Sequence, residues 1–164
     1  MIQIHVFDLG GGKTRRMYEN LVPVGNLRSG DNTNKDRASN QLVQFFLRKF
    51  FERRPGQTPA TATKSKSFLL DGKVGTQTVE GIHRFQAANR QAGAPLFDDS
   101  RVSVPIGINV PGTQMRWTIH ALNSFFVKRF GEEEFNNLFA NREIAREAPE
   151  LAAELVAEEQ LLRS

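Results

Sequence analysis

The sequence predicts a mainly α-helical protein with a short N-terminal β segment and a C-terminal helical extension. Apolar residues recur at helical spacing in three separate segments, 36–53, 77–91 and 114–130. Strand-like alternation is confined to the first ten residues. The chain has 164 residues, of which 39% are hydrophobic and 24% charged, so it is long enough for one domain with a proper core.

The N-terminal segment has the pattern of a short strand. Ile2, Ile4 and Val6 alternate with polar residues, and glycines 10–12 end the pattern in a turn. The same glycines precede Lys-Thr, but a phosphate-binding P-loop needs a glycine where Phe7 stands, so an ordinary glycine-rich turn is the prediction. Residues 19–34 are rich in turn formers and are expected to be a loop, with a short extended piece at 21–24.

Three helices are expected next. The first runs from about Asp36 to Arg53, and a polar linker rich in Pro, Thr, Ser and Lys follows at 54–67. The second covers 77–91. Three prolines then forbid a long helix, and Thr113 is the predicted cap of a third helix at 114–130. The tail is expected to form two helical pieces broken near Pro149, with an amphipathic stripe that consists of Leu151, Leu155, Leu162 and Val156.

A glycine-containing turn leads into the second helix. Asp71-Gly72 is a tight-turn dipeptide, and Gly75 is predicted to adopt the left-handed conformation closed to most other residues. Thr76 or Thr78 is the predicted helix cap, a role typically worth about 1 kcal/mol. The turn is therefore expected to start a helix whose apolar face is buried.

The spacing of this stretch resembles the peptidoglycan-binding domain of bacterial cell-wall hydrolases. The pattern is D-G-x-V-G-x-x-T-x-x-x-I-x-x-F-Q, filled by Asp71, Gly72, Val74, Gly75, Thr78, Ile82, Phe85 and Gln86. The resemblance implies a three-helix core without catalysis of its own, which binds the cell wall. It divides the chain into an N-terminal strand and loop extension (1–34), a peptidoglycan-binding-like helical core (35–130) and an acidic helical tail packed on the core or on a partner (131–164).

The resemblance also implies a ligand, peptidoglycan or a muropeptide, and residues that would bind it. Polar and basic side chains near the motif would bind the carboxylates of a muropeptide, and Trp117 offers a ring for stacking on a sugar. At helical spacing among apolar residues, however, a tryptophan such as Trp117 is more often part of the core than a stacking surface. The predicted ligand-binding residues are Asp71, Arg84, Gln86, Asn89, Arg90 and Trp117, and the structural motif residues are Gly72, Gly75, Thr78, Ile82 and Phe85.

Catalysis is not expected. The chain has no cysteine and no Gly-x-Ser-x-Gly element, and its three histidines show no metal-ligand spacing. Asp98-Asp99 and the run of glutamates at 132–134 are expected to be solvated rather than a catalytic pair. No metal, cofactor or membrane span is predicted.

Charge is unevenly distributed along the chain. Residues 1–130 hold 19 Lys and Arg against 9 Asp and Glu, a net charge of +10, whereas residues 131–164 hold 3 against 9, a net charge of −6. A basic body attracts phosphate or carboxylate polymers, unless the acidic tail folds back and neutralises part of it.

Two other functions remain open. The linker at 54–67 and the segment before the third helix depart from the family pattern. Together with the amphipathic tail, these departures favour a protein-interaction module of a phage-like or secretion machine, with the tail as the partner surface. Nucleic-acid binding is a weaker option because the basic residues are scattered. No secretory signal is recognised, so the expected location is the cytoplasm or, after signal-independent export, the cell wall.

Overall fold

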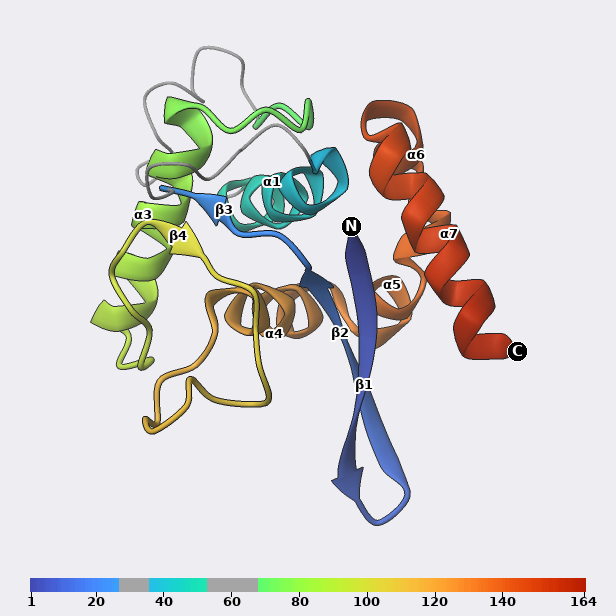
Figure 1. Ribbon diagram of the computed structural model, residues 1–164, viewed down its shortest axis with the longest axis horizontal. Coiled ribbons are helices and arrows are strands. Elements are labelled where there is room, and N and C mark those ends of the chain that lie inside the picture. Colours follow the sequence, from blue (N-terminus) through green and yellow to red (C-terminus); the bar gives the residue numbers. More distant parts are fainter. Residues whose placement is uncertain (27–35, 53–67) are drawn as a thin grey trace.

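The computed structural model describes residues 1–26, 36–52 and 68–164, and in these residues the protein is mainly helical (Figure 1). The predicted linker at 54–67 lies outside the described residues. The helices and strands, in chain order, are β1 (Ile2–Gly10), β2 (Lys13–Asn20), β3 (Val24–Gly25), α1 (Arg37–Phe51), α3 (Thr76–Gln91), β4 (Arg101–Val102), α4 (Thr118–Phe130), α5 (Glu132–Asn136), the 3-10 helix η1 (Leu138–Ala140), α6 (Arg142–Glu147) and α7 (Pro149–Arg163).

The N-terminal strand is confirmed, but it belongs to a hairpin. β1 pairs antiparallel with β2, and the connecting glycines 10–12 all have positive φ angles. The prediction of a loop from residue 19 is therefore wrong at Glu19 and Asn20, which belong to β2. The base of the hairpin is buried in the core, whereas its far end projects from the body and exposes Val6 and Leu9 (Figure 1). β3 pairs with β4 in a second sheet of two strands.

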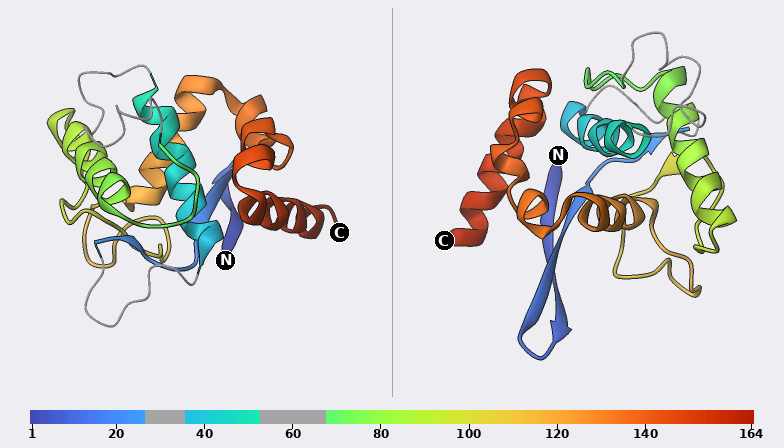
Figure 2. Two further views of the ribbon diagram at one scale, coloured as in Figure 1. Left: turned by 90° about the horizontal axis from the view of Figure 1, so that it is seen from above. Right: turned by 180° about the vertical axis from the view of Figure 1, so that it is seen from behind.

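Helix α1 lies between α3 and α4 on one side and the tail on the other (Figure 1, Figure 2). Its aromatic side chains fill the space between the helices: the rings of Phe50 and Phe85 lie 4.8 Å apart at their centroids, and those of Phe45 and Phe126 lie 5.8 Å apart. Burial of such rings provides most of the driving force for this packing. The first two helices match the predicted ranges, and Asp36 caps α1 by accepting a hydrogen bond from the Ser39 N–H.

The third helix begins later than predicted. α4 starts at Thr118, and the residue before it, Trp117, has extended backbone angles. Thr113 is not a helix cap, since its hydroxyl donates to the Val110 carbonyl and accepts from the Met115 N–H. Residues 113–117 therefore end the long connection between α3 and α4 instead of opening α4.

The turn before α3 is held by two polar side chains of α1. Asn40 donates to the Gly72 carbonyl at 2.8 Å, and the Gln44 carbonyl oxygen accepts from the Gly72 N–H at 3.0 Å. Gly72 has a φ angle of 74°, and an added Cβ atom would lie 2.9 Å from the Cβ of Arg37. Glycine is thus required at position 72 both for backbone conformation and for space.

Two predictions about the start of α3 are wrong. Gly75 has a φ angle of −128°, an extended value open to any residue, because it is the N-cap of α3 and not a left-handed turn residue. No threonine caps the helix: α3 has no side-chain cap, and the buried hydroxyl of Thr78 instead lies 3.2 Å from Gln44 Nε2, which donates to it. Ile82 and Phe85 are fully buried, as the motif predicts.

The tail packs on the rest of the chain. It consists of α5, η1, α6 and α7 instead of the two predicted pieces, and Pro149 opens α7. Leu151 and Leu155 are fully buried, but Val156 and Leu162 are exposed, so only half of the predicted stripe is buried.

Ion pairs join this tail to the basic body. The side chain of Arg48 on α1 is 8% exposed and binds Glu143 at 2.7 Å and Glu147 at 2.8 Å, and it also donates to the Phe68 carbonyl. On β2, Arg16 binds Glu159 at 2.6 Å. The charge asymmetry of the sequence is therefore partly neutralised within the molecule.

Candidate functional site

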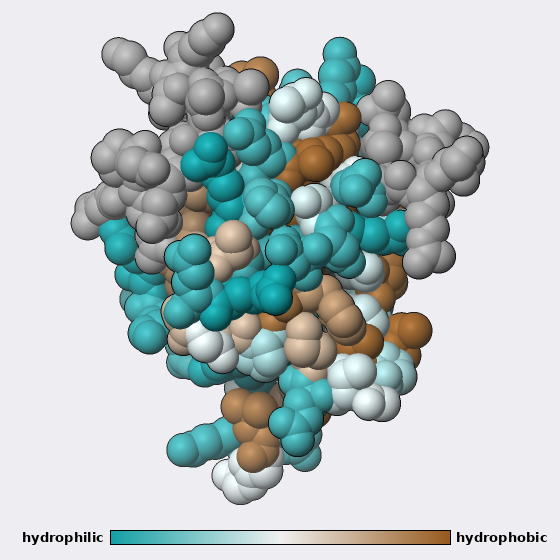
Figure 3. Space-filling view, turned by 90° about the vertical axis from the view of Figure 1, so that its left-hand side faces the viewer, coloured by the Kyte–Doolittle hydropathy of each residue, from teal (hydrophilic) through white to brown (hydrophobic). Residues whose placement is uncertain are grey.

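A cavity of about 540 Å³ lies between α3 and α4, which we call the α3–α4 cavity. The face of the molecule that carries α3 is mostly hydrophilic (Figure 3). Both helices contribute positions three or four residues apart, as expected for facing sides of two helices. The lining residues are Phe50, Ala88, Asn89, Ala92, Arg116, Ala121, Ser124, Phe125, Lys128 and Arg129.

The lining of the α3–α4 cavity is cationic. Arg116, Lys128 and Arg129 contribute positive charge, and none of the described lining residues is acidic. Lys128 and Arg129 are exposed, and neither has a carboxylate partner within 4.0 Å among the ion pairs of the described residues. Arg116 donates to the Ser124 hydroxyl at 2.8 Å, which orients its guanidinium. These groups suit a carboxylate or another oxyanion.

Aromatic side chains form the apolar part of the same cavity. Phe50 and Phe125 pack edge to face with centroids 5.0 Å apart, and Phe125 is partly exposed. Small side chains at positions 88, 92 and 121 leave the space open. An aromatic wall beside cations suits an amphipathic ligand better than a bare inorganic ion.

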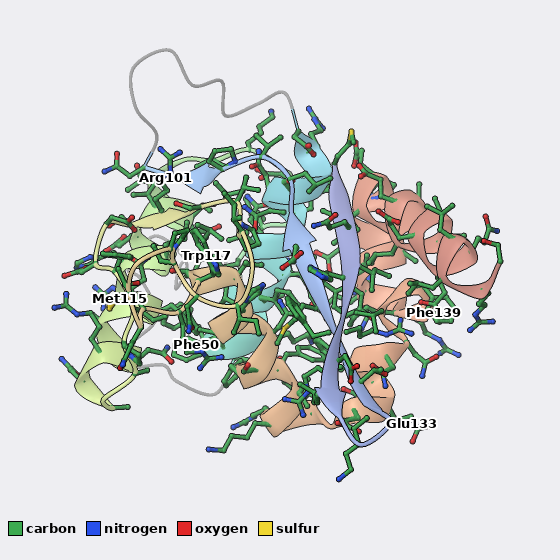
Figure 4. All side chains as sticks on the ribbon, turned by 60° about the horizontal axis from the view of Figure 1, so that its bottom comes forward. Phe50, Arg101, Met115, Trp117, Glu133 and Phe139 are labelled. Atoms are coloured by element: carbon green, nitrogen blue, oxygen red, sulfur yellow. The ribbon has the colours of Figure 1, made fainter. Side chains whose placement is uncertain are left out.

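A smaller cavity of about 220 Å³ lies under the connection between α3 and α4, which we call the Trp117 cavity. Arg116 contributes to the lining of both cavities. Trp117, Arg101 and Met115 lie on this side of the molecule, away from Phe139 of the tail (Figure 4). The lining residues of the Trp117 cavity are Phe97, Asp99, Arg101, Ser103, Val110, Arg116, Trp117 and Thr118.

Gln86 of the Phe-Gln motif fixes one wall of the Trp117 cavity. Its side-chain amide nitrogen donates to Asp99 Oδ1 at 3.1 Å, to the Arg101 carbonyl at 3.1 Å and to the Thr118 hydroxyl at 3.0 Å. Its carbonyl oxygen accepts from the Ser100 N–H at 2.9 Å. These hydrogen bonds connect α3 with α4 and with residues 99–101. Because Gln86 is 0% exposed, its amide does not face solvent.

The structure brings two of the predicted ligand-binding residues to cavities. Asn89 lines the α3–α4 cavity and Trp117 lines the smaller one. The other predicted residues line neither of these cavities. Arg84 pairs with Glu80 at 3.5 Å, Arg90 pairs with Asp98 at 3.0 Å, and the Asp71 carboxylate accepts from the Lys73 N–H within its own turn.

Sequence reasoning missed the cations of the α3–α4 cavity. Lys128 and Arg129 stand in the last turn of a predicted helix, where basic residues are common for reasons of helix electrostatics alone. The available signal was the spacing of Ala121, Ser124 and Lys128, which places small and basic residues on one face of α4. That signal becomes informative only once the facing helix is known.

A buried glutamate and two histidines lie at the base of the hairpin. Glu19 Oε2 lies 2.5 Å from His120 Nε2, and Glu19 Oε1 lies 3.2 Å from His5 Nδ1 and accepts from Gln3 at 2.8 Å. Burial raises the pKa of the Glu19 carboxyl, but the hydrogen bonds from His120 and Gln3 outweigh burial and hold this pKa below its usual range. His120 is thus a satisfied buried histidine. Within residues 1–26, 36–52 and 68–164, no group of three or more potential ligand side chains could hold a metal ion.

No protein-family model, curated protein or solved structure matches this chain. In the described part of the chain, every helix is too short or too polar to cross a bilayer.

Proposed function

We propose that this protein binds bacterial cell-wall peptidoglycan without cleaving it, through the α3–α4 cavity. The observation that supports this proposal most is the cationic, partly aromatic lining of that cavity. Peptidoglycan presents stem-peptide carboxylates next to sugar rings, and Lys128, Arg129 and Arg116 would meet the former while Phe125 contacts the latter. Asn89 Nδ2 donates to the Phe85 carbonyl at 2.9 Å, and the second N–H and the carbonyl oxygen of this amide would serve neutral polar groups of the ligand.

The resemblance of the turn at 71–75 and the following helix to the peptidoglycan-binding domain supports the same proposal. α1, α3 and α4 would be the three helices of such a core. The conformation of Gly72 and the hydrogen bond from its N–H to the Gln44 side chain determine where α3 starts. The direction of α3 in turn determines which of its side chains line the cavity.

Retention on purified sacculi tests the proposal. The wild-type protein is expected to co-sediment at low salt, and the Lys128→Gln/Arg129→Gln double variant to bind about tenfold more weakly, equivalent to about 1.4 kcal/mol. The matched control is Lys13→Gln/Arg142→Gln, which removes the same charge from two exposed positions outside the cavity. Equal losses in both double variants, or no retention of the wild type, would contradict the proposal.

A second candidate is a protein-interaction module, favoured by exposed apolar side chains in the connection between α3 and α4. Ile106 and Ile108 are 70% and 69% exposed, and Phe97 is also exposed. On the tail, Leu151 and Leu155 are buried in the core, so only the exposed Val156, Leu161 and Leu162 of α7 would be available for such a role. An Ile106→Ser/Ile108→Ser variant that loses self-association or partner capture, while it still binds sacculi, would assign that activity to the connection.

Nucleic-acid binding is the weakest candidate, since several of the basic residues are engaged within the molecule. Arg16, Arg48 and Lys49 are paired with glutamates of the tail. Binding to random-sequence DNA that weakens steeply with salt would support this candidate, and no binding at low salt would exclude it.

A further inference from the structure

Two isoleucines are exposed in the connection between α3 and α4. Ile106 and Ile108 are 70% and 69% exposed, and no large apolar side chain in the described part of the chain is more exposed. Gly107 between them has a φ angle of 70°, so the backbone turns there. Exposed apolar residues scattered singly need no explanation, but two on either side of one turn form a small apolar point. We call residues 106–109, all of them exposed, the isoleucine tip.

The isoleucine tip is held in place from both sides. Pro105 before it is buried, and Val110 after it packs against the core. The Val110 N–H donates to the Met115 carbonyl at 2.9 Å, and Asn109 pairs with Arg116 in an antiparallel bridge. The connection that carries the tip lies on the side of the molecule opposite the tail (Figure 1). Because the loop is anchored, contact with a partner requires little further ordering of its backbone.

Positive charge lies at the base of the isoleucine tip. Arg101 and Arg116 line the Trp117 cavity, whose wall includes the residue directly after the tip. Arg116 also lines the α3–α4 cavity, together with Lys128 and Arg129. Residues 84–129 contain six Lys and Arg against two Asp, a net charge of +4. This charge favours a partner with a negative surface.

The chemistry of the isoleucine tip favours a lipid surface over a protein partner. Stable protein interfaces bury about 800 Å² on each partner and depend most on Trp, Tyr and Arg, which a tip of four residues with two isoleucines does not provide. Aliphatic side chains enter hydrocarbon without a complementary pocket. The peptide groups of the tip need hydrogen bonds, so the tip would lie among lipid headgroups, with only the isoleucine side chains in contact with acyl chains.

We propose that the isoleucine tip docks this protein on an anionic phospholipid bilayer, with Ile106 and Ile108 inserted between the lipids and Arg101 and Arg116 near the lipid phosphates. This activity goes beyond the proposed function and does not depend on it. A single myristoyl chain gives an association constant of only about 10⁴ M⁻¹, and two isoleucine side chains bury less apolar surface than that chain. Docking therefore requires the apolar contact and the charge together.

Co-sedimentation with lipid vesicles tests this proposal. At low salt, the wild-type protein is expected to bind vesicles of phosphatidylglycerol and phosphatidylcholine, and not to bind vesicles of phosphatidylcholine alone. Ile106→Ser/Ile108→Ser is expected to bind the anionic vesicles at least about tenfold more weakly. The matched control, Leu9→Ser/Leu69→Ser, replaces two exposed leucines outside the connection and should bind as the wild type does. No binding of the wild type, equal binding to both kinds of vesicle, or equal losses in both double variants would overturn the proposal.

A fluorescent label shows which part of the protein contacts the lipid and leaves both isoleucines in place. The chain has no cysteine, so Asn109→Cys and Gln160→Cys each carry one environment-sensitive dye, on the tip and on an exposed position of α7. Anionic vesicles are expected to shift the emission to shorter wavelength at position 109 and not at position 160, and any other pattern would overturn the assignment to the tip. The vesicles contain no peptidoglycan, so vesicle binding without sacculus retention would refute only the proposed function, and sacculus retention without vesicle binding would refute only this inference.

Discussion

Replacement of Gln86 by leucine tests how the motif shapes the site. Leucine has a similar volume but forms none of the four hydrogen bonds that Gln86 makes with residues 99–101 and Thr118. Asp99 is exposed and is rehydrated after the change, whereas Thr118 is buried and residues 100 and 101 are partly buried. Each buried group left without a partner costs about 1–3 kcal/mol, and partial relaxation of the loop reduces the total. We therefore expect the free energy of unfolding to fall by about 3 kcal/mol.

Thermal unfolding followed by circular dichroism measures this loss. For a domain of this size, 1 kcal/mol corresponds to about 2–4 °C, so the midpoint is expected to fall by about 6–12 °C. The control is Gln91→Leu, which makes the same chemical change at an exposed position of α3 and is expected to stay within about 0.5 kcal/mol of the wild type. Acrylamide should also quench the fluorescence of Trp117 more strongly in Gln86→Leu, because the wall beside the indole is loosened. A Gln86→Leu midpoint equal to that of Gln91→Leu would refute this reasoning.

Three further predictions concern the frame around the site. Arg48→Met removes the ion pairs to Glu143 and Glu147, which keep Lys49 and Arg146 as partners, and leaves the Phe68 carbonyl without its Arg48 donor, so chemical denaturation should show a loss of about 2 kcal/mol; a loss below about 1 kcal/mol would contradict the packing of the tail. Gly72→Ala, with its positive φ angle and tight space, should destabilise the protein by about 2 kcal/mol or more, whereas Gly75→Ala should cost less than about 1 kcal/mol; equal effects in urea unfolding would refute the turn geometry. Because the pKa of Glu19 is lower in the folded than in the unfolded state, its stabilising effect is present above about pH 4.3 and is lost as the pH falls through the folded pKa. The stability difference between wild type and Glu19→Gln should therefore shrink between pH 6 and pH 3, and a constant difference in urea titrations would contradict this linkage.

The sequence predicts the helices of this protein better than its strands. α1 and α3 follow from apolar residues at helical spacing and from Asp36, whose side chain caps α1. β2 has no apolar alternation of its own, since only Met17 and Tyr18 interrupt a polar segment, and it forms because β1 lies beside it. Strand formation that depends on a partner is not visible in a local pattern.

The candidate site was predictable only in part. The motif indicates Gln86 as an important residue, but its amide is used inside the protein because α3, α4 and residues 99–101 meet there. Lys128 and Arg129 could not be assigned, because a long irregular connection separates α3 from α4 and hides which faces of the two helices oppose each other. A pattern read along the chain identifies helix faces, whereas a binding site depends on how the helices are paired.

The most direct test of the central claim is the affinity of the protein for soluble muropeptides before and after their carboxylates are converted to amides, measured by calorimetry at low salt. Amidation keeps the size and the sugars of the ligand and removes only the charge that the α3–α4 cavity is proposed to bind. We expect binding of the unmodified muropeptides and a loss of about tenfold or more on amidation, equivalent to about 1.4 kcal/mol. Equal affinity for both ligands, or no binding of either, would contradict the account.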